Sequence, residues 1–517
     1  MIAYESGLSA NGSVRLANDL GQGVVSNNLG TLLDWLITPR DGTDFHICWD
    51  IDHFCAPVLK LMPVGALRQL FARGKTDVGQ YFIIYNQGKS LFIGKGGQQR
   101  INLYWVGQYY RDEEVQDLQE VKKRGEQLIA ELASIGIRPK KLTSPVTLFE
   151  DALYKLKMPT HLQMPVEVNR MAWKCSRKQW TEAHVLGHFE YTWDYDLNSA
   201  FPGAMAELLN CSSEYGDWVH EKAKPLGAVY GFLQGMVDIR TDLSPIVYAD
   251  AYGHQLNPRD VWPTCITAQD LQCITELEVG GFETQDSWWF VPKKEVYPAR
   301  QFIRFLYGNR SQSPLLNRVL KLAQVGLYGK TLQTFADGAP GGLFCPVWGA
   351  LVESVVRCQV MKFVHEYRVQ DNVLHISTDG ILLDKQVNLP ASTGLGSWRL
   401  DNESPALIVS SGTLFYGHKK PAGLTYSEAM ELVQASPEAS AWSKGMRRRM
   451  VLGDYIASSR AEIGEVKDTQ TSFALHTLSA QHDRHFAALP KTGTELLAHR
   501  YTSTAHSARR LAKGDNI

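Results

Sequence analysis

The sequence lacks the features that place a chain in a membrane or outside a cell. No apolar run approaches the roughly 18 residues that span a bilayer. Residues 1–6 have neither the basic start nor the apolar core of a signal peptide. The eight cysteines are scattered, with no close pair of the kind that binds zinc. We therefore expect a cytoplasmic protein with reduced thiols and no membrane partner.

A net charge is also missing, since 53 basic residues meet 54 acidic ones. Composition alone does not indicate a nucleic-acid partner, so the distribution has to decide. Residues 299–330 contain no acidic side chain. Taken alone, such a stretch is usually the solvent-exposed face of a helix. The six basic residues there are Arg300, Arg304, Arg310, Arg318, Lys321 and Lys330.

Two segments bear carboxylates where strands are expected to end. The alternation from Phe189 to Asp196 predicts a strand that delivers Asp196 to its end. Residues 377–380, Ser-Thr-Asp-Gly, lie between two apolar runs and predict a hairpin turn that holds Asp379. Carboxylates on neighbouring strand ends are the hard oxygen ligands of a two-metal phosphoryl-transfer site. Either segment alone also arises by chance.

The basic stretch between these segments predicts two helices, 300–310 and 315–328, broken at Pro314. In the second helix, Leu316, Leu320, Ala323 and Leu327 form one apolar face. Another face has Arg318, Lys321, Val325 and Tyr328. Without the two carboxylates this is an amphipathic surface helix. With them, the cationic face suits a nucleoside triphosphate and its base.

In order and spacing, residues 194–202, 321–330 and 377–380 resemble motifs A, B and C of family B DNA polymerases. Residues 143–148, 186–190 and 397–400 resemble segments of the protein-primed branch, found in phages and linear plasmids. The resemblance covers residues 140 to 420 well and the first 140 loosely. It implies a multidomain α/β and α+β fold, in a bacterial cytoplasm. An RNase H-like exonuclease-type domain precedes a right-hand polymerase of palm, fingers and thumb.

The implied domains follow the motifs along the chain. They are an exonuclease-like domain (1–145), a linker or template-side segment (146–187), the palm with an insertion (188–298), the fingers (299–332), the second part of the palm (333–402), and the thumb with a C-terminal helical region (403–517).

The implied activity is DNA-directed synthesis, in which dNTPs extend a primer 3′-hydroxyl on primer–template DNA. Two Mg²⁺ ions, for which Mn²⁺ can substitute, are held by Asp196, Asp379 and the backbone of Leu197, and Lys321 contacts the triphosphate as a proton donor. A terminal protein is a candidate priming partner. The remaining nucleotide contacts are Phe201 as the steric gate, Arg310, Arg318 and Tyr328. The implied DNA contacts are Gly187, Ser199, Gly329, Lys330, Thr378, Tyr416 and Lys419.

Several positions depart from the family pattern. Ser377 stands where motif C has its first aspartate, Val325-Gly326 replaces Asn-Ser in motif B, and Leu414 replaces the lysine of a Lys-x-Tyr motif. Two alternatives therefore stay open. One is a polymerase-like DNA-binding protein without catalysis, and the other is a nucleotidyltransferase that needs no template or primes on a protein hydroxyl. Asp194, two residues before Asp196, is expected to be a solvated strand carboxylate, with a back-up ligand as the alternative.

The first 145 residues resemble an exonuclease domain imperfectly. Strands are expected at 45–49 and 81–85, and a helix from a cap at Asp112 to Ser134. Ala3 stands where the first catalytic aspartate belongs. Since the chemistry needs about four carboxylates around two metals, we expect a degenerate domain. The residues that match the exonuclease motifs are Glu5, Asp50, Asp52 and, after Tyr110, Glu114. At the other end, the chain from Thr425 is expected to be mainly helical.

Overall fold

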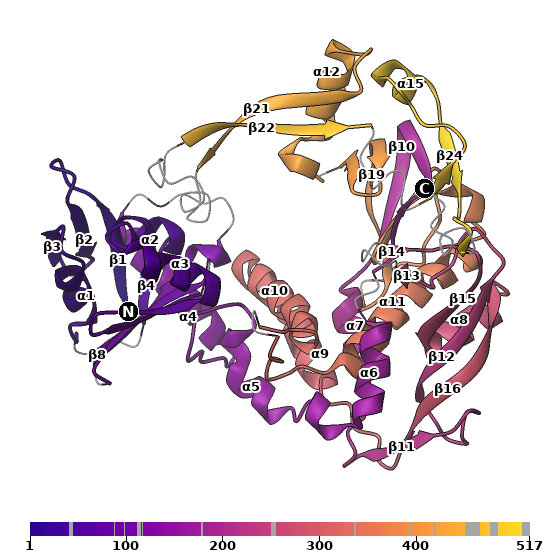
Figure 1. Cartoon of the computed structure of the whole chain (residues 1–517), viewed down its shortest axis with the longest axis horizontal. Coiled ribbons are helices and arrows are strands. Elements are labelled where there is room, and N and C mark those ends of the chain that lie inside the picture. The colour runs from indigo at the N-terminus through magenta and orange to yellow at the C-terminus, as the bar shows by residue number, and fades with distance from the viewer. Residues whose placement is uncertain are drawn as a thin grey trace. The chain divides into compact units, whose positions relative to one another are not determined.

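The computed structural model of the chain describes two compact units, the first formed mainly by Met1–Lys155 and Leu306–Gly326 and the second by Leu156–Phe305 and most of the rest (Figure 1). The residues described are 1–40, 45–86, 88–97, 99–110, 115, 117–176, 179–249, 255–335, 338–392, 394–417, 419–449, 466–475 and 484–508.

The first unit is built on an eight-stranded sheet in the order β3-β2-β1-β4-β8-β7-β6-β5. The pairs β1–β4 and β4–β8 are parallel, and the others are antiparallel. In β6, alternate residues Tyr81, Ile83 and Tyr85 enter the core, as the period of two predicts. The strands are β1 (Ile2–Leu8), β2 (Val14–Asn18), β3 (Gly23–Ser26), β4 (His46–Cys48), β5 (Lys75–Val78), β6 (Tyr81–Asn86), β7 (Ser90–Lys95) and β8 (Gln99–Trp105).

Helices pack against this sheet, and the longest of them differs from the prediction. Helix α4 begins at Leu118, where Asp117 accepts a hydrogen bond from the Glu120 amide at 2.8 Å. The expected cap, Asp112, lies outside the described residues, and an aspartate five residues later has that role. The predicted end at Ser134 is confirmed. The other helices are α1 (Leu29–Ile37), α2 (Ile51–Leu59), α3 (Val64–Arg73) and α5 (Glu150–Lys155).

A second sheet is the centre of the second unit. Its order is β20-β19-β10-β18-β17-β9, and β24 joins the start of β10. Strand β10 (Val185–Leu197) is central, with β19 on one side and β18 on the other. The other strands are β9 (Thr181–Ala183), β17 (Val373–Ser377), β18 (Gly380–Leu383), β19 (Trp398–Ser410), β20 (Thr413–Tyr416), β23 (His485–Phe486) and β24 (Tyr501–Thr504).

A four-stranded antiparallel sheet, β11-β16-β12-β15, shares a hydrophobic core with the central sheet. Between them lies helix α11 (Pro346–Glu366), which is buried on nearly every side. That burial requires apolar residues all round the helix rather than on one stripe. The remaining elements here are α6 (Val166–Cys175), α7 (Ala200–Ala206), β11 (Gly216–His220), β12 (Tyr230–Ile239), β13 (Tyr248–Ala249), β14 (Gln255–Leu256), β15 (Asp260–Thr267), α8 (Ala268–Glu276) and β16 (Gly280–Pro292).

The two helices of the basic stretch are confirmed as α9 (Arg300–Gly308) and α10 (Pro314–Thr331). Proline starts the second helix, and the Ser313 hydroxyl accepts the Leu316 amide at 3.0 Å as its cap. The predicted apolar face is buried, whereas Lys321 and Val325 are exposed. The 3.6-residue period therefore placed both faces correctly.

The expectation of a mainly helical C-terminal region is wrong. Helix α12 (Tyr426–Ala435) is followed by a two-stranded ribbon of β21 (Ala441–Arg449) and β22 (Val466–Ala474). Among the described residues that follow, α15 (Gly493–Ala498) is the one helix before β24, and β24 pairs with β10. None of the helices described here combines the length and apolarity needed to cross a membrane.

Candidate active site

The two predicted carboxylates lie at one edge of the central sheet, Asp196 near the end of β10 and Asp379 in the turn between β17 and β18. Asp196 of β10 pairs with Gly380 of β18, the residue directly after Asp379. The Leu197 amide donates to the Asp379 carbonyl oxygen at 3.1 Å. Because Mg²⁺ takes oxygen ligands, the carbonyl oxygen of Leu197 is the backbone atom that could bind it. Two strand ends therefore hold Asp196 and Asp379 in a fixed register.

The turn that carries Asp379 is held in an unusual conformation. Thr378 has φ 61°, a region that β-branched residues rarely occupy. Its amide donates to the Trp180 carbonyl oxygen at 2.7 Å, and the Asp379 amide donates to the Ser377 carbonyl oxygen at 2.8 Å. Such strain persists where the surrounding structure enforces it, and it often accompanies function. The turn presents Asp379 beside the end of β10.

Asp196 already faces a cation. The guanidinium of Arg399, from β19, lies 3.1 Å from Asp196 and 2.9 Å from Asp401. This shows that the position in front of Asp196 accepts positive charge. In the described part of the chain, no group of three or more His, Cys, Asp or Glu side chains could hold a metal. Two carboxylates and a carbonyl nevertheless fit Mg²⁺, which commonly binds one or two carboxylates together with substrate phosphates.

Asp194 is not the solvated carboxylate that its strand position predicts. It is 5 % exposed and accepts a hydrogen bond from the Tyr416 hydroxyl at 2.9 Å. Burial raises the pKa of Asp194 to about 6, although Lys419 and Tyr416 lower it. An irregularity in the pairing of β10 with β19 falls directly after Asp194. Asp194 is therefore a buried hydrogen-bond acceptor, whereas Asp196 stays partly exposed.

The second unit also contains a contact between two aromatic rings, those of Phe201 and Tyr328. Phe201, in α7, lies 4.6 Å from the ring of Tyr328 between centroids, at 37°. The helix begins after Ser199, whose φ of 54° turns the chain sharply out of β10. This turn places the predicted gate residue, Phe201, in the first turn of α7, shortly after the end of β10. The structure therefore brings Asp196, Asp379, Phe201 and Tyr328 together in one unit.

A buried polar network that the sequence did not predict lies next to this ring pair. The Tyr328 hydroxyl donates to Glu353 Oε1 at 2.5 Å. One turn further along α11, Arg357 contacts both carboxylate oxygens of Asp270, at 3.1 and 3.2 Å. Although burial favours its neutral form, Asp270 and Glu353 raise the pKa of Arg357. An acid and a base four residues apart within an apolar run are the signal that could have revealed this network.

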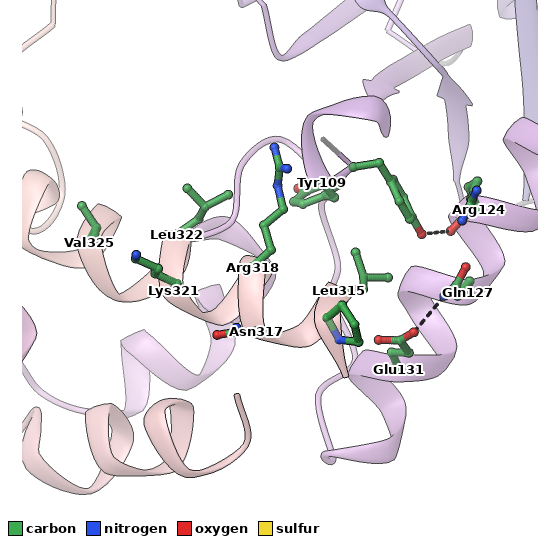
Figure 2. Close-up of a pocket in the computed structure, with 12 residues that line it drawn as sticks. Tyr109, Arg124, Gln127, Glu131, Leu315, Asn317, Arg318, Lys321, Leu322 and Val325 are labelled. Carbon is green, nitrogen blue, oxygen red and sulfur yellow. Dashed lines mark hydrogen bonds between the residues drawn. The ribbon is translucent and has the colours of Figure 1, made fainter. Parts of the chain in front are cut away.

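The predicted triphosphate ligands occupy the first unit. Arg318 and Lys321 rise from α10 into a pocket of about 620 Å³ (Figure 2). On its other side, the Tyr110 hydroxyl donates to the Arg124 carbonyl oxygen at 2.6 Å. Arg310 is not among its lining residues and instead donates to Asn317 at 2.9 Å. The pocket is lined by Tyr109, Tyr110, Arg124, Gln127, Glu131, Pro314, Leu315, Asn317, Arg318, Lys321, Leu322 and Val325.

The other predicted DNA contacts have varied environments. Gly187 has φ 135° and is packed so closely under the segment at His499 that a Cβ would meet its carbonyl at 2.7 Å. The Lys419 ammonium lies 5.0 Å from the centre of the Tyr416 ring. Gly329 is exposed, and Lys330 donates to Gln333 at 2.7 Å. Their roles toward DNA stay predictions.

Three of the four carboxylates that match the exonuclease motifs have a local structural role among the described residues. Glu5 pairs with Arg15 at 2.8 Å, and Asp50 caps α2 by accepting the His53 amide at 2.9 Å. Asp52 accepts a hydrogen bond from Tyr85, and burial raises its pKa. Ala3 is fully buried, and its amide donates to Asp19 at 2.8 Å. Glu114 lies outside the described residues.

The comparisons with known proteins identify the fold. No protein-family model matches the sequence, and no curated protein sequence matches it at a significant level. Phi29 DNA polymerase in an orthorhombic crystal form is similar with a TM-score of 0.61 and 12 % identity. Its ternary complex with primer-template DNA and incoming nucleotides gives 0.62 and 13 %, and its complex with single-stranded DNA gives 0.57 and 12 %. Each match covers 92 % of this chain and 100 % of the other.

At this identity the likeness shows the fold. The chain has the mixed α/β fold of phi29 DNA polymerase, a protein-primed family B polymerase, over most of its length. The resemblance predicted from motifs A, B and C is therefore confirmed at the level of the fold.

Proposed function

We propose that the protein is a DNA-directed DNA polymerase that extends a primer 3′-hydroxyl with dNTPs. The observation that carries the proposal is the placement of Asp196 on β10 beside the turn that holds Asp379, in a chain with the phi29 polymerase fold. In the proposed layout, the first unit contains the exonuclease-like domain, the central sheet is the palm, and α9 and α10 form the fingers. Residues after 402 form the thumb region, and a terminal protein is the candidate priming partner.

The carboxylates would hold two Mg²⁺ ions together with the Leu197 carbonyl. When bound, the metals lower the pKa of the primer hydroxyl and neutralise the charge that develops on the triphosphate. Arg399 contacts the same carboxylate, so we propose that it keeps Asp196 oriented and yields its place to a metal. The buried hydrogen bond between Tyr416 and Asp194 would stabilise β10 close to Asp196.

The cations of α10 would bind the nucleotide. Arg318 and Arg310 can donate to phosphate oxygens, and a guanidinium does so with two parallel hydrogen bonds. Lys321, exposed on the same helix, can contact the triphosphate and give a proton to the departing pyrophosphate. Tyr328 would lie beneath the nascent base pair, and Phe201 would exclude a ribose 2′-hydroxyl by contact.

Primer extension with a labelled primer–template tests the proposal. A ladder of products whose sequence follows the template supports a polymerase. Products that ignore the template, or labelling of a protein hydroxyl, would instead favour a different nucleotidyltransferase. Tight DNA binding without any product would favour the non-catalytic alternative, for which the serine at position 377 is the motivating departure.

The Phe201→Ala variant tests sugar selection. We expect it to raise the efficiency of ribonucleotide incorporation relative to deoxynucleotide incorporation by about tenfold or more, since the ring is a steric filter. Tyr191→Ala, an exposed aromatic on the same strand as Asp196, is the matched control and should leave the ratio unchanged. Single-nucleotide kinetics give the ratio of the two kcat/KM values. Unchanged discrimination in Phe201→Ala would move the gate elsewhere.

A further expectation concerns editing by the first unit. Because Ala3 replaces a metal ligand, we expect little or no 3′→5′ shortening of single-stranded DNA in Mg²⁺. End-labelled strands incubated without nucleotides measure this. Rapid shortening that disappears in Asp50→Ala or Asp52→Ala would contradict the expectation and make the unit a proofreader. Loss of shortening only in Glu5→Ala would mean that the second exonuclease motif is misplaced.

A further inference from the structure

Glu353 is an acidic residue that is almost completely buried. It lies in the middle of α11, is 2 % exposed, and has Val352 and Val356 as buried neighbours on the same helix. Burying a carboxylate is costly unless it is paired and hydrogen-bonded. The Tyr328 hydroxyl donates to it at 2.5 Å, within the range of strong hydrogen bonds to a carboxylate. Glu353 therefore fixes the hydroxyl end of Tyr328.

The other end of Tyr328 is fixed by contact between rings. Its ring lies 4.6 Å from that of Phe201, an offset arrangement that aromatic pairs favour. Phe201 sits in α7, which packs against α11. Tyr328 is therefore held between Phe201 on one side and Glu353 on the other, and movement of either would shift the ring pair.

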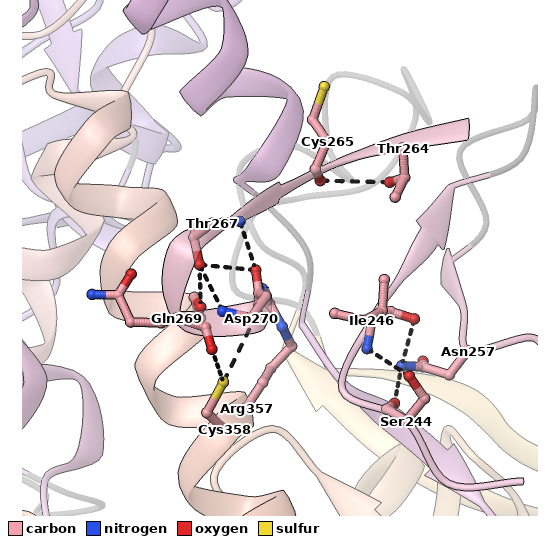
Figure 3. A network of polar contacts seen from close by, with 11 residues as sticks. Ser244, Ile246, Asn257, Thr264, Cys265, Thr267, Gln269, Asp270, Arg357 and Cys358 are labelled. Atoms are coloured by element: carbon pink, nitrogen blue, oxygen red, sulfur yellow. Dashed lines mark hydrogen bonds and ion pairs between the residues drawn. The ribbon is translucent and has the colours of Figure 1, made fainter. Parts of the chain in front are cut away.

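Helix α11 itself is anchored by a second buried contact. Arg357, 3 % exposed, contacts Asp270 at 3.1 Å, and Asp270 forms a capping box with Thr267 at the start of α8 (Figure 3). The Thr267 hydroxyl lies 2.6 Å from that of Ser354, the residue after Glu353. These contacts tie the Glu353 turn of α11 to the four-stranded sheet.

Stability alone does not account for this arrangement. Buried charges pay a desolvation cost, so apolar residues of similar size often serve stability as well or better. What charged groups add is a directional contact, because a carboxylate accepts a hydroxyl along a defined line. The arrangement suits the positioning of a ring whose place has to be reproduced at every turnover.

We propose that Glu353 is a positioning residue that holds Tyr328 against Phe201 and thereby sets the sugar selectivity of the nucleotide pocket. The proposal rests on the polymerase function proposed above. When Glu353 cannot accept the hydroxyl, the Tyr328 ring loses the hydrogen bond that fixes its hydroxyl end, and its support of Phe201 weakens. The Phe201 ring then excludes a ribose 2′-hydroxyl less effectively, and ribonucleotide incorporation rises.

Four variants test the proposal: Glu353→Ala, Glu353→Gln, Tyr328→Phe and the double variant Glu353→Ala/Tyr328→Phe. The measurement is the ratio of kcat/KM for a deoxynucleotide to that for the matching ribonucleotide on one primer–template. We expect Glu353→Ala and Tyr328→Phe each to lower the ratio about tenfold, the factor for losing one hydrogen bond to a charged group. The double variant should lose no more than either single one. Glu353→Gln should retain most of the selectivity, because its amide oxygen still accepts the hydroxyl.

Glu366→Ala, at the exposed end of the same helix, is the matched control. Melting temperatures and primer–template affinity separate selectivity from misfolding, and Tyr328→Phe removes one hydroxyl without emptying the core. A folded Tyr328→Phe variant with unchanged selectivity would overturn the proposal. The proposal would also be overturned if the double variant lost selectivity by the product of the two factors measured in the single variants. If the wild-type protein synthesises no templated product, the polymerase function itself fails; templated synthesis with unchanged selectivity refutes only the role of Glu353.

Discussion

Replacing Asp196 or Asp379 with alanine is expected to abolish templated nucleotide incorporation while leaving primer–template affinity nearly unchanged. Under the proposed function, each variant would remove an oxygen ligand of the metals, and a two-metal site stabilises transition-state charge by several kcal/mol, so the rate should fall about a thousandfold or more. Affinity should persist because contacts to the DNA backbone, rather than the carboxylates, supply it. Single-turnover incorporation gives the rate, and fluorescence anisotropy with a labelled primer–template gives the affinity.

Asp371→Ala is the control for this pair. Asp371 is exposed and lies just before β17, the strand that leads to the Asp379 turn. Its replacement should leave both quantities unchanged. A residual rate of more than a few per cent in either Asp196→Ala or Asp379→Ala would refute the assignment of the site. Weak DNA binding in both would instead indicate that the carboxylates organise the sheet.

The second large effect concerns stability. The Arg484 and Glu182 side chains are both almost fully buried, with Nη1 3.4 Å from the Glu182 carboxylate. Arg484 also donates to the Asp242 carbonyl at 3.0 Å and to the Ser503 hydroxyl at 2.7 Å. Arg484→Ala removes this guanidinium from the buried Glu182 carboxylate, which keeps the hydrogen bond from Trp180 Nε1 at 2.9 Å, and we expect a loss of about 3–5 kcal/mol. Denaturant-induced unfolding measures this loss, from the change in the free energy of the unfolding transition of the second unit.

Arg500→Ala is a demanding control, since Arg500 lies in the same C-terminal segment. Its side chain is 59 % exposed and pairs with Asp384 at 3.6 Å. An exposed pair of this kind contributes about 1 kcal/mol or less. Equal losses in the two variants would contradict the claim that burial makes the Arg484 contact important.

The sequence predicted those features of the site that depend on residues close together in the chain. The break at Pro314, the two faces of α10 and the strand that ends in Asp196 all follow from periodicity and from the chemistry of proline. The placement of Asp196 beside the turn that holds Asp379 needed the further step of placing two strand ends side by side. That step came from the order of the motifs, and the register of β10 with β18 agrees with it.

Contacts between distant residues could not be predicted in this way. Asp194 and Tyr416 are separated by 222 positions in the sequence, and Asp196 and Arg399 by 203. A period of two places Asp194 beside Asp196, but it cannot show that a tyrosine from β20 covers one and not the other. The C-terminal strands were missed for the same reason, because β24 is specified by an edge of β10 rather than by its own short sequence.

The pairing of β24 with β10 also affects how the protein is made. Val185 and Leu186 leave the ribosome long before Tyr501 and Thr502, their partners in the sheet. Until then the start of β10 lacks this partner, and unpaired strand edges are the places where nascent chains associate wrongly. A chain shortened before residue 501 would contain β10, the strand of Asp196, without β24 paired to its start. The sheet that bears Asp196 is therefore complete only after residues 501 and 502 have been synthesised.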